Sequence, residues 1–188
     1  EKVPTEGITK ITAADFEYAN ATDHTIKLLG RSRAIDDNTA EVMVAPFLLS
    51  KEHPLAMVHG VFNAVFVTGN MLGDSMYYGR GAGKLPPASA VVSDVIDCAR
   101  HQGKVIMCFW DKEEVKLADI GEAERSFFIR AKAGAEDAVT AAFPGGRMVH
   151  LKDRKEDFGY FTQPMKESEF LAKYEALGEQ MLGRIRII

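Results

Sequence analysis

Residues 77–92 read Tyr-Tyr-Gly-Arg-Gly-Ala-Gly-Lys-Leu-Pro-Pro-Ala-Ser-Ala-Val-Val and contain a glycine-rich turn around which the rest of the chain is organised. Before the turn, residues 74–78 have the character of a strand end. After it, residues 88–100 place valine, isoleucine and alanine side chains at helical spacing, which predicts a helix. The stretch therefore predicts a strand, a glycine turn and a helix in direct succession.

The turn contains three glycines, Gly79, Gly81 and Gly83, each separated from the next by one residue. Glycine adopts positive φ angles and lets another group approach the backbone closely. The first turn of the following helix offers backbone N–H groups that have no helical partner and that favour anions. The turn is interpreted either as an anion or nucleotide contact or as a tight connection and nothing more.

Two standard phosphate-binding motifs are absent from this turn. A P-loop has four residues between its first glycine and a Gly-Lys pair, and then Ser or Thr. Here the spacing before Gly83-Lys84 is too short, and Leu85 follows the lysine. The Rossmann fingerprint spaces its glycines as G-x-G-x-x-G, whereas these glycines are evenly spaced. One such turn is not expected to hold a dinucleotide by itself.

The composition is that of an ordinary globular chain, long enough for one large or two small domains. The 188 residues are 46% hydrophobic and 27% charged, and the net charge is −4. This charge argues against nucleic acid or an anionic membrane as the main partner, and no apolar run reaches the ~20 residues of a transmembrane helix. Cys98 and Cys108 are expected to be buried free thiols in a reducing cytosol, which predicts a cytoplasmic protein. Because the chain begins at Glu1 without Met or a signal-like segment, we expect a piece of a longer protein.

The first hundred residues predict an α+β arrangement. Thr12 is the expected N-cap of a short helix, with Asp15 as the capping-box acid. Four strands are predicted, of which the first two form a hairpin, at residues 25–33, 40–47, 63–68 and 74–78. We expect one mixed or antiparallel sheet with helices on one face. Its apolar strands would leave an exposed face, so a second subunit or a further domain is expected to cover it.

The last third of the chain predicts a ferredoxin-like domain. Its elements follow the order βαββαβ, at residues 126–132, 135–143, 147–152, 158–163, 167–179 and 182–188. In the final strand, Arg184 and Arg186 alternate with apolar residues and are expected on a solvent-exposed face. The apolar residues 105–110 of the preceding connector are expected to pack against the first part of the chain.

Few residues qualify as candidates for catalysis or metal binding. Glu6 is interpreted either as a substrate-facing carboxylate or as a solvated loop acid. His53 lies in a predicted turn before a proline, and neither it nor His59 has a metal ligand at suitable spacing, so no metal site is predicted. Lys27 and Lys84 are expected to be solvated, and the sequence offers no nucleophile with a positioned base.

Three blocks of sequence, in this order and at this spacing, resemble bacterial homoserine dehydrogenases over roughly the first hundred residues. They are Glu6-Gly7-Ile8 with Ile26-Lys27-Leu28-Leu29, then His53-Pro54-Leu55-Ala56 leading into Asn63-Ala64-Val65, and finally the glycine turn with Ala88-Ser89-Ala90-Val91-Val92 and Asp94. The βαββαβ tail looks like the ACT regulatory domain that many of these enzymes carry after the catalytic part.

The resemblance implies an enzyme that interconverts L-homoserine and L-aspartate 4-semialdehyde with NAD or NADP, in threonine, methionine and isoleucine biosynthesis. The family has an N-terminal Rossmann domain, a substrate and dimerisation domain, and often an ACT domain. Residues 1–105 then correspond to the C-terminal portion of the catalytic and dimerisation domain, 106–124 to a connector and 125–188 to the regulatory domain. The catalytic residues are expected upstream of Glu1, and this chain alone is expected to be an inactive dimer or larger homo-oligomer.

The resemblance also implies that the glycine turn contacts the cofactor from the side of the substrate domain. The first glycine of the family motif corresponds to Gly79, and Gly81, Ala82 and Gly83 complete the predicted cofactor-binding loop. The chain departs from the family at Pro87, where threonine is usual, and at residues 132–136, which lack the usual Asp-x-Pro-Gly turn. The second departure leaves two roles open for the tail, binding of an amino-acid effector such as threonine or pairing of subunits.

A function of another class is also compatible with these residues, namely a free-standing amino-acid-binding or oligomerisation module without a catalytic role. An upstream reading frame that contains G-x-G-x-x-G would exclude this alternative. The sequence contains no nucleophile–base pair or metal cluster that would support a self-contained enzyme of a different kind.

Overall fold

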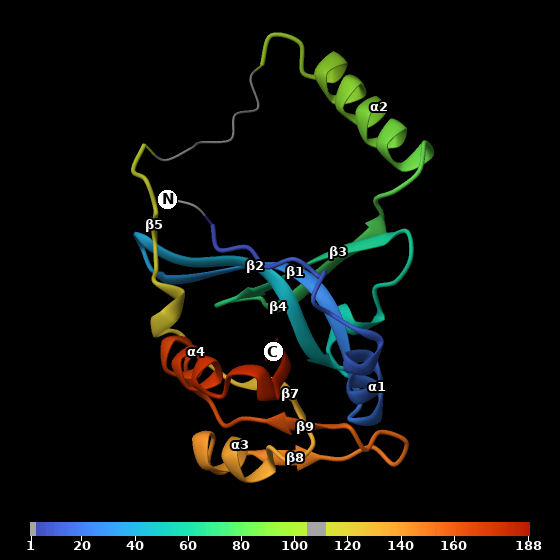
Figure 1. Ribbon diagram of the computed structural model, residues 1–188. Helices are drawn as coiled ribbons and strands as arrows, with labels where there is room; N and C mark the ends of the chain where they lie inside the picture. The colour runs from blue at the N-terminus through green and yellow to red at the C-terminus, as the bar shows by residue number, and fades with distance from the viewer. Residues whose placement is uncertain (1–2, 105–111) are drawn as a thin grey trace. The chain divides into compact units, whose positions relative to one another are not determined.

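The computed structural model describes residues 3–104 and 112–188 (Figure 1). The helices are α1 (Ala13–Ala21), α2 (Leu85–Arg100), α3 (Glu136–Ala142) and α4 (Glu167–Ala176). The strands are β1 (His24–Asp36), β2 (Thr39–Ser50), β3 (Phe62–Gly69), β4 (Gly73–Arg80), β5 (Lys116–Leu117), β6 (Glu124–Arg125), β7 (Phe127–Lys132), β8 (Arg147–Val149), β9 (Asp157–Phe161), β10 (Met165–Lys166) and β11 (Met181–Ile187). Short 3₁₀ turns are η1 (Pro54–Met57), η2 (Ile120–Glu122) and η3 (Gly178–Gln180).

The chain divides into two compact units. The larger combines Glu1–Lys51 with Glu114–Ile188, and the smaller is Glu52–Glu113. The ferredoxin-like segment therefore shares its unit with the first helix and the first hairpin. The domain boundaries predicted at residues 105 and 125 refer to the domains of the parent family and remain predictions.

A sheet in the order β1-β2-β11-β7-β9-β8 forms the centre of the larger unit, and β5 pairs with the start of β2. β7, β8, β9 and β11 have the antiparallel order of a ferredoxin-like fold, with its first and third strands in the middle. β1 and β2 form the predicted hairpin, with Asp37 and Asn38 in the turn between them. β11 lies parallel to β2, with Arg186 opposite Phe47, so strands from both ends of the sequence share one sheet.

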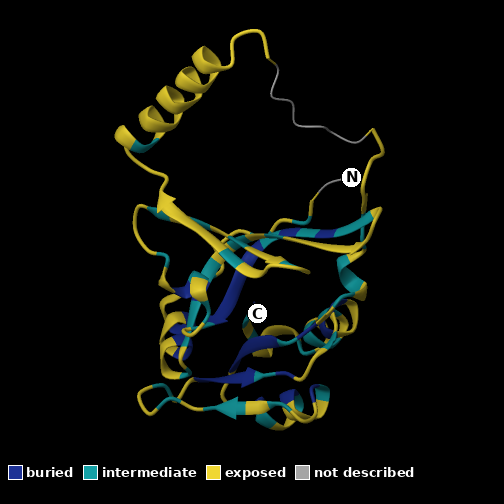
Figure 2. Cartoon of the chain, turned by 180° about the vertical axis from the view of Figure 1, so that it is seen from behind, coloured by how far each residue is buried: buried dark blue, intermediate teal, exposed yellow. Residues whose placement is uncertain are grey.

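The two faces of this sheet carry separate hydrophobic cores, because neighbouring residues of a strand point to opposite sides. On one face Phe127 packs with α3 and α4, and Phe170 of α4 stacks on it with ring centroids 3.6 Å apart. On the other face Phe128 packs with α1, where Tyr18 is its aromatic neighbour. Figure 2 shows these buried segments in dark blue. Burial of each such aromatic side chain contributes about 1.5–3 kcal/mol.

The smaller unit contains η1, the β3–β4 hairpin and α2. Among the described strands β3 and β4 pair only with each other, so the expected single sheet of four strands is wrong. A strand pattern does not name its partner, and the edge of β2 that faces away from β1 is occupied by β11 and β5. α2 has no buried residue, and its apolar side chains, among them Val91, Val92, Val95 and Ile96, are exposed.

Local features of the sequence are confirmed where neighbouring residues determine them. The Asp15 carboxylate accepts hydrogen bonds from the Thr12 backbone N–H at 2.7 Å and from the Thr12 hydroxyl at 2.8 Å, which stabilises the start of α1. The prediction of a buried thiol at Cys98 is wrong, since this residue is exposed on α2. Cys108 and the packing expected of residues 105–110 lie outside the described residues. None of the described helices is long and apolar enough to span a membrane.

Candidate functional site

The predicted cofactor loop connects β4 to α2. Gly79 lies in β4, opposite Asn63 of β3. Gly81, Ala82 and Gly83 follow in the connection itself, and all four loop residues are exposed. The structure therefore brings the predicted residues together on one short, accessible stretch of backbone.

The three glycines differ in what requires them. Gly83 has a φ of +107°, which side-chain-bearing residues rarely adopt. A Cβ on Gly81 would lie 1.8 Å from Nδ2 of Asn63, so this side chain would have to move. A Cβ on Gly79 would meet no atom within 4 Å. The fold itself thus explains glycine at positions 81 and 83 but not at position 79.

The start of α2 offers fewer hydrogen-bond donors than a typical helix. Lys84 is the N-cap, Leu85 is the first helical residue, and Pro86 and Pro87 come next. Proline has no backbone N–H, so two of the first three helical residues donate nothing. An anion at this loop would depend on the loop backbone and Leu85 more than on the helix terminus.

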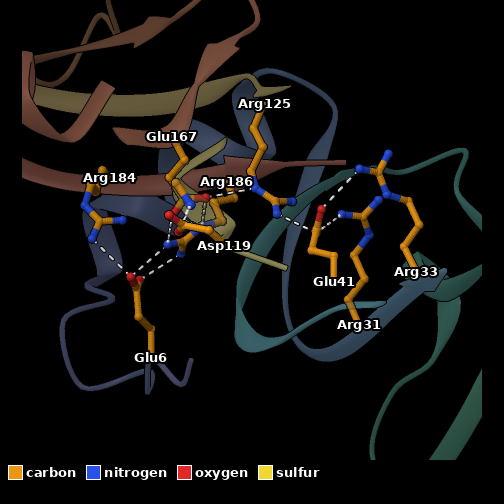
Figure 3. A network of polar contacts seen from close by, with 10 residues as sticks. Glu6, Arg31, Arg33, Glu41, Asp119, Arg125, Glu167, Arg184 and Arg186 are labelled. Carbon is orange, nitrogen blue, oxygen red and sulfur yellow. Dashed lines mark hydrogen bonds and ion pairs between the residues drawn. The ribbon is translucent and has the colours of Figure 1, made fainter. Parts of the chain in front are cut away.

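A chain of ion pairs runs through the larger unit from Glu41 of β2 to Glu6 (Figure 3). Arg125 donates to Glu41 at 2.5 Å and to Glu167 at 2.8 Å. Arg186 continues the series of ion pairs, because it donates to the same Glu167 and, at 2.9 Å, to Glu6. Arg125, Glu167 and Arg186 are all buried. Such charges are tolerated in an interior only when each has a partner.

Three further arginines complete the two ends of this network. Arg31 and Arg33 of β1 donate to Glu41 at 3.1 Å and 3.2 Å. Arg184 donates to Glu6 at 3.1 Å. The network therefore links β1 and β2 with β6, α4, β11 and the N-terminal segment that carries Glu6.

The arginines keep the carboxylates of Glu6 and Glu41, at the two ends of this network, ionised. The hydrogen bond from Arg186 is the main cause that lowers the pKa of Glu6 to about 2, and the charges of Arg186 and Arg184 add to it, against partial burial. Burial opposes ionisation of Glu41, yet the hydrogen bond and charge of Arg125, helped by Arg31 and Arg33, lower its pKa as well. Neither group is a proton donor near neutral pH.

A second network ties α1 to the sheet. Arg130 of β7 donates to Asp15 at 2.9 Å and to Asp157 at 3.0 Å. Asp157 also accepts from Arg154 and, at 2.9 Å, from the Tyr18 hydroxyl. Burial, with the hydrogen bond to Asp157, raises the pKa of Tyr18, so this phenol stays neutral. Each of these groups is engaged within the fold, which is typical of a structural network.

Several expectations about single residues need correction. Arg186 is 2% exposed rather than solvated, and Arg184 is largely buried, because both pair with Glu6. Glu6 is accordingly an arginine-paired carboxylate and not a solvated loop acid. Lys27 is half-buried, and burial lowers its pKa, whereas Lys84 is exposed as expected. Alternation of charged and apolar residues in a strand looks the same for a solvated face and for a buried, paired one, which is why sequence reasoning missed this network.

In the described part of the chain, no group of three or more His, Cys, Asp or Glu residues could hold a metal ion. His53 has a structural role instead. Its Nδ1 accepts a hydrogen bond from the Leu55 backbone N–H at 3.1 Å and so caps η1.

Comparison with known proteins agrees with the sequence blocks described above. The family model for homoserine dehydrogenase matches residues 1–96, about half of the chain. The chain belongs to the homoserine dehydrogenase family. The homoserine dehydrogenase of Synechocystis sp. is 49% identical over 100 residues, which are 52% of this chain and 23% of that protein. That of Helicobacter pylori is 36% identical over 139 residues, 74% of this chain and 33% of that protein.

Solved structures extend the similarity to nearly the whole chain. The homoserine dehydrogenase of Thiobacillus denitrificans superposes with a TM-score of 0.76 and 26% identity, over 97% of this chain and 47% of that one. A Staphylococcus aureus homoserine dehydrogenase gives a TM-score of 0.72 and 25% identity, over 99% and 47%. The predicted fold class is thereby confirmed. This member of the homoserine dehydrogenase family spans about a quarter to a third of the two curated relatives and under half of the solved chains.

Proposed function

We propose that this chain is part of a homoserine dehydrogenase and supplies one side of its nicotinamide-cofactor site. The glycine at position 79 carries the proposal, because the fold gives no internal reason for it. A residue without a side chain lets a ligand approach the strand backbone closely. Gly79, Gly81, Ala82 and Gly83 would hold the cofactor, which supplies the hydride chemistry.

The complete enzyme would interconvert L-homoserine and L-aspartate 4-semialdehyde with NAD or NADP, in the cytoplasmic synthesis of threonine, methionine and isoleucine. In the described residues, the buried carboxylates and guanidinium groups are held in ion pairs within the fold. We therefore assign the acid–base groups and most cofactor contacts to the remainder of the enzyme. The chain alone would be inactive.

The chain would also contribute to assembly and regulation. Large apolar side chains are exposed on both parts of the smaller unit, in β3–β4 and in α2. Apolar surface of this kind is typical of an interface, and we assign it to a second subunit and to the nucleotide-binding domain. The ferredoxin-like segment would be an ACT-like domain, which binds an effector such as threonine or pairs subunits.

A chimera tests the proposal, with these 188 residues in place of the matching part of the Helicobacter pylori enzyme. We expect the chimera to reduce NAD⁺ or NADP⁺ in the presence of homoserine and the isolated chain to show no turnover. Gly79→Ala in the chimera should raise the KM for the cofactor about tenfold, because a methyl group occupies the approach of the ligand. Gly69→Ala is the matched control, since its Cβ would meet only ordinary contacts in the same hairpin.

Titration calorimetry of the isolated chain with NADPH supplies the second arm. We expect no heat, because one loop supplies only part of a dinucleotide site. Tight binding of NADPH by the isolated chain would contradict the proposal that this chain supplies only one side of the cofactor site. A folded but inactive chimera, together with an isolated chain that binds threonine, would favour the non-catalytic amino-acid-binding module instead.

A further inference from the structure

A cavity of about 530 Å³ opens in the larger unit, which does not contain the glycine loop. Its walls come from residues 5–7 and 9–11, Asp15 of α1, Pro46 of β2, Tyr174 of α4 and residues 182–185 of β11. This volume lies within the range of 300–1,000 Å³ typical of small-molecule sites. Every residue of the lining belongs to the described part of the larger unit.

Arg184 contributes a guanidinium group to the lining of this cavity. Its Nη2 donates to Glu6 at 3.1 Å, and the guanidinium lies over the Tyr174 ring, 6.0 Å from its centroid. Its Nη1 is buried and has no acceptor among the described residues. A buried charged donor without an acceptor costs about 1–3 kcal/mol or more, so the hydrogen bonds within the fold do not use the full capacity of this guanidinium.

The charges that line the cavity favour a negative ligand. Lys10 lines it as well, is exposed, and forms no ion pair with another described residue. The two acids of the lining are already neutralised, Glu6 by Arg186 and Asp15 by Arg130. The cations with free capacity are therefore Arg184 and Lys10, and both face the same cavity.

The remaining lining limits the kind of anion. Ile11 and Leu182 provide apolar surface suited to a short aliphatic group. Inorganic phosphate would pair with the same cations but has no group that contacts the apolar part of the lining. A monocarboxylate with an apolar tail matches both features.

We propose that this cavity binds a small carboxylate with a short aliphatic tail, whose carboxylate pairs with the accessible part of the Arg184 guanidinium and with the ammonium group of Lys10. Each charged hydrogen bond strengthens binding by roughly ten- to a hundredfold. The site is built from the larger unit alone, so it does not depend on the proposed cofactor contact.

Titration of the full 188-residue chain with sodium isovalerate tests the site, followed by amide NMR shifts of residues 5–11 and 182–185. We expect a Kd on the order of 1 mM for a ligand of this size. Isovaleramide, which has the same tail without the charge, and inorganic phosphate should each bind at least tenfold more weakly. If isovaleramide bound as tightly as isovalerate, the proposed ion pair would be wrong. If phosphate bound more tightly than isovalerate, the assignment of the ligand as a carboxylate would be wrong.

Variants of the two cations separate the site from general charge effects. Arg184→Met and Lys10→Met should each weaken isovalerate binding about tenfold or more. Lys152→Met is the matched control, because this lysine is exposed and lies outside the cavity lining. Lys10 is exposed, so its variant keeps the fold even if Arg184→Met does not. Equal affinity of the Lys10→Met and Lys152→Met proteins would overturn the proposal.

Discussion

Gly79, Gly81 and Gly83 have three different backbone environments within five residues. Gly83 has a positive φ, which favours glycine, and a Cβ on Gly81 would collide with the side chain of Asn63. Nothing inside the described fold disfavours a side chain at position 79. Stability and ligand binding should therefore separate within this one loop. The spacing of the glycines in the sequence does not reveal this difference, because it depends on backbone angles and on a neighbouring strand.

Alanine at these positions should affect stability unequally. Gly83→Ala places a side chain at φ +107° and should lower the free energy of unfolding of the smaller unit by about 1–3 kcal/mol. Gly79→Ala meets open space and should change it by less than about 0.5 kcal/mol. Denaturant unfolding followed by hydrogen exchange in β3 and β4 measures both. Equal destabilisation by the two variants would contradict the environments described here.

Glu6 provides a pH test of the buried ion network. Its pKa is lowered from an ordinary 4.5 to about 2, so the ionised form stabilises the fold above pH 4.5, and this contribution disappears as the pH falls towards 2. Glu6→Gln should lower the free energy of unfolding by about 1 kcal/mol at pH 6, allowing for solvent screening of a partly exposed pair. Urea unfolding of both proteins at pH 6, 4 and 2.5 should show the difference shrinking. A constant difference would contradict the assignment.

At the scale of elements, the sequence predicts what neighbouring residues determine. The capping box of α1, the hairpin of β1 and β2 and the end of α2 at Arg100 all follow from local pattern, although α2 begins at Leu85 and not at the predicted residue 88. The pairing of β11 with β2 does not, because its partners are separated by more than a hundred residues. The ion pair of Arg186 with Glu6 is missed for the same reason, whereas the position of the glycine loop is found from sequence.

α2 should be the least protected helix of the isolated chain, because it has no buried residue. We expect its amide hydrogens to exchange at least roughly a hundredfold faster than those of β7 and β11, which lie inside the large sheet. Exchange measured by mass spectrometry on the 188-residue chain and on the active chimera tests this. Protection of α2 should appear in the chimera, where we propose that the nucleotide-binding domain covers this helix. Equal protection of α2 and β7 in the isolated chain would argue against a missing cover.

At the scale of the whole molecule, the distribution of apolar surface separates the two units. The larger unit buries two clusters that contain aromatic residues, one on each face of its sheet. The smaller unit exposes valine and tyrosine side chains along β3 and β4 as well as along α2. A unit that leaves this much apolar surface in water is typical of a part of a larger assembly. The proposed dimer therefore depends on the smaller unit.

The β3–β4 hairpin should hold this dimer together. Val65 and Tyr77 lie opposite each other on it and are 61% and 70% exposed. Val65→Lys combined with Tyr77→Glu keeps a favourable cross-strand pair within the hairpin but places two charges in the interface, so light scattering should change from dimer to monomer. Val91→Lys with Val95→Glu, a matched pair one helical turn apart on α2, should leave the dimer intact because that surface is assigned to the nucleotide-binding domain. A monomeric starting protein, or loss of the dimer in both variants, would contradict this division of the surface.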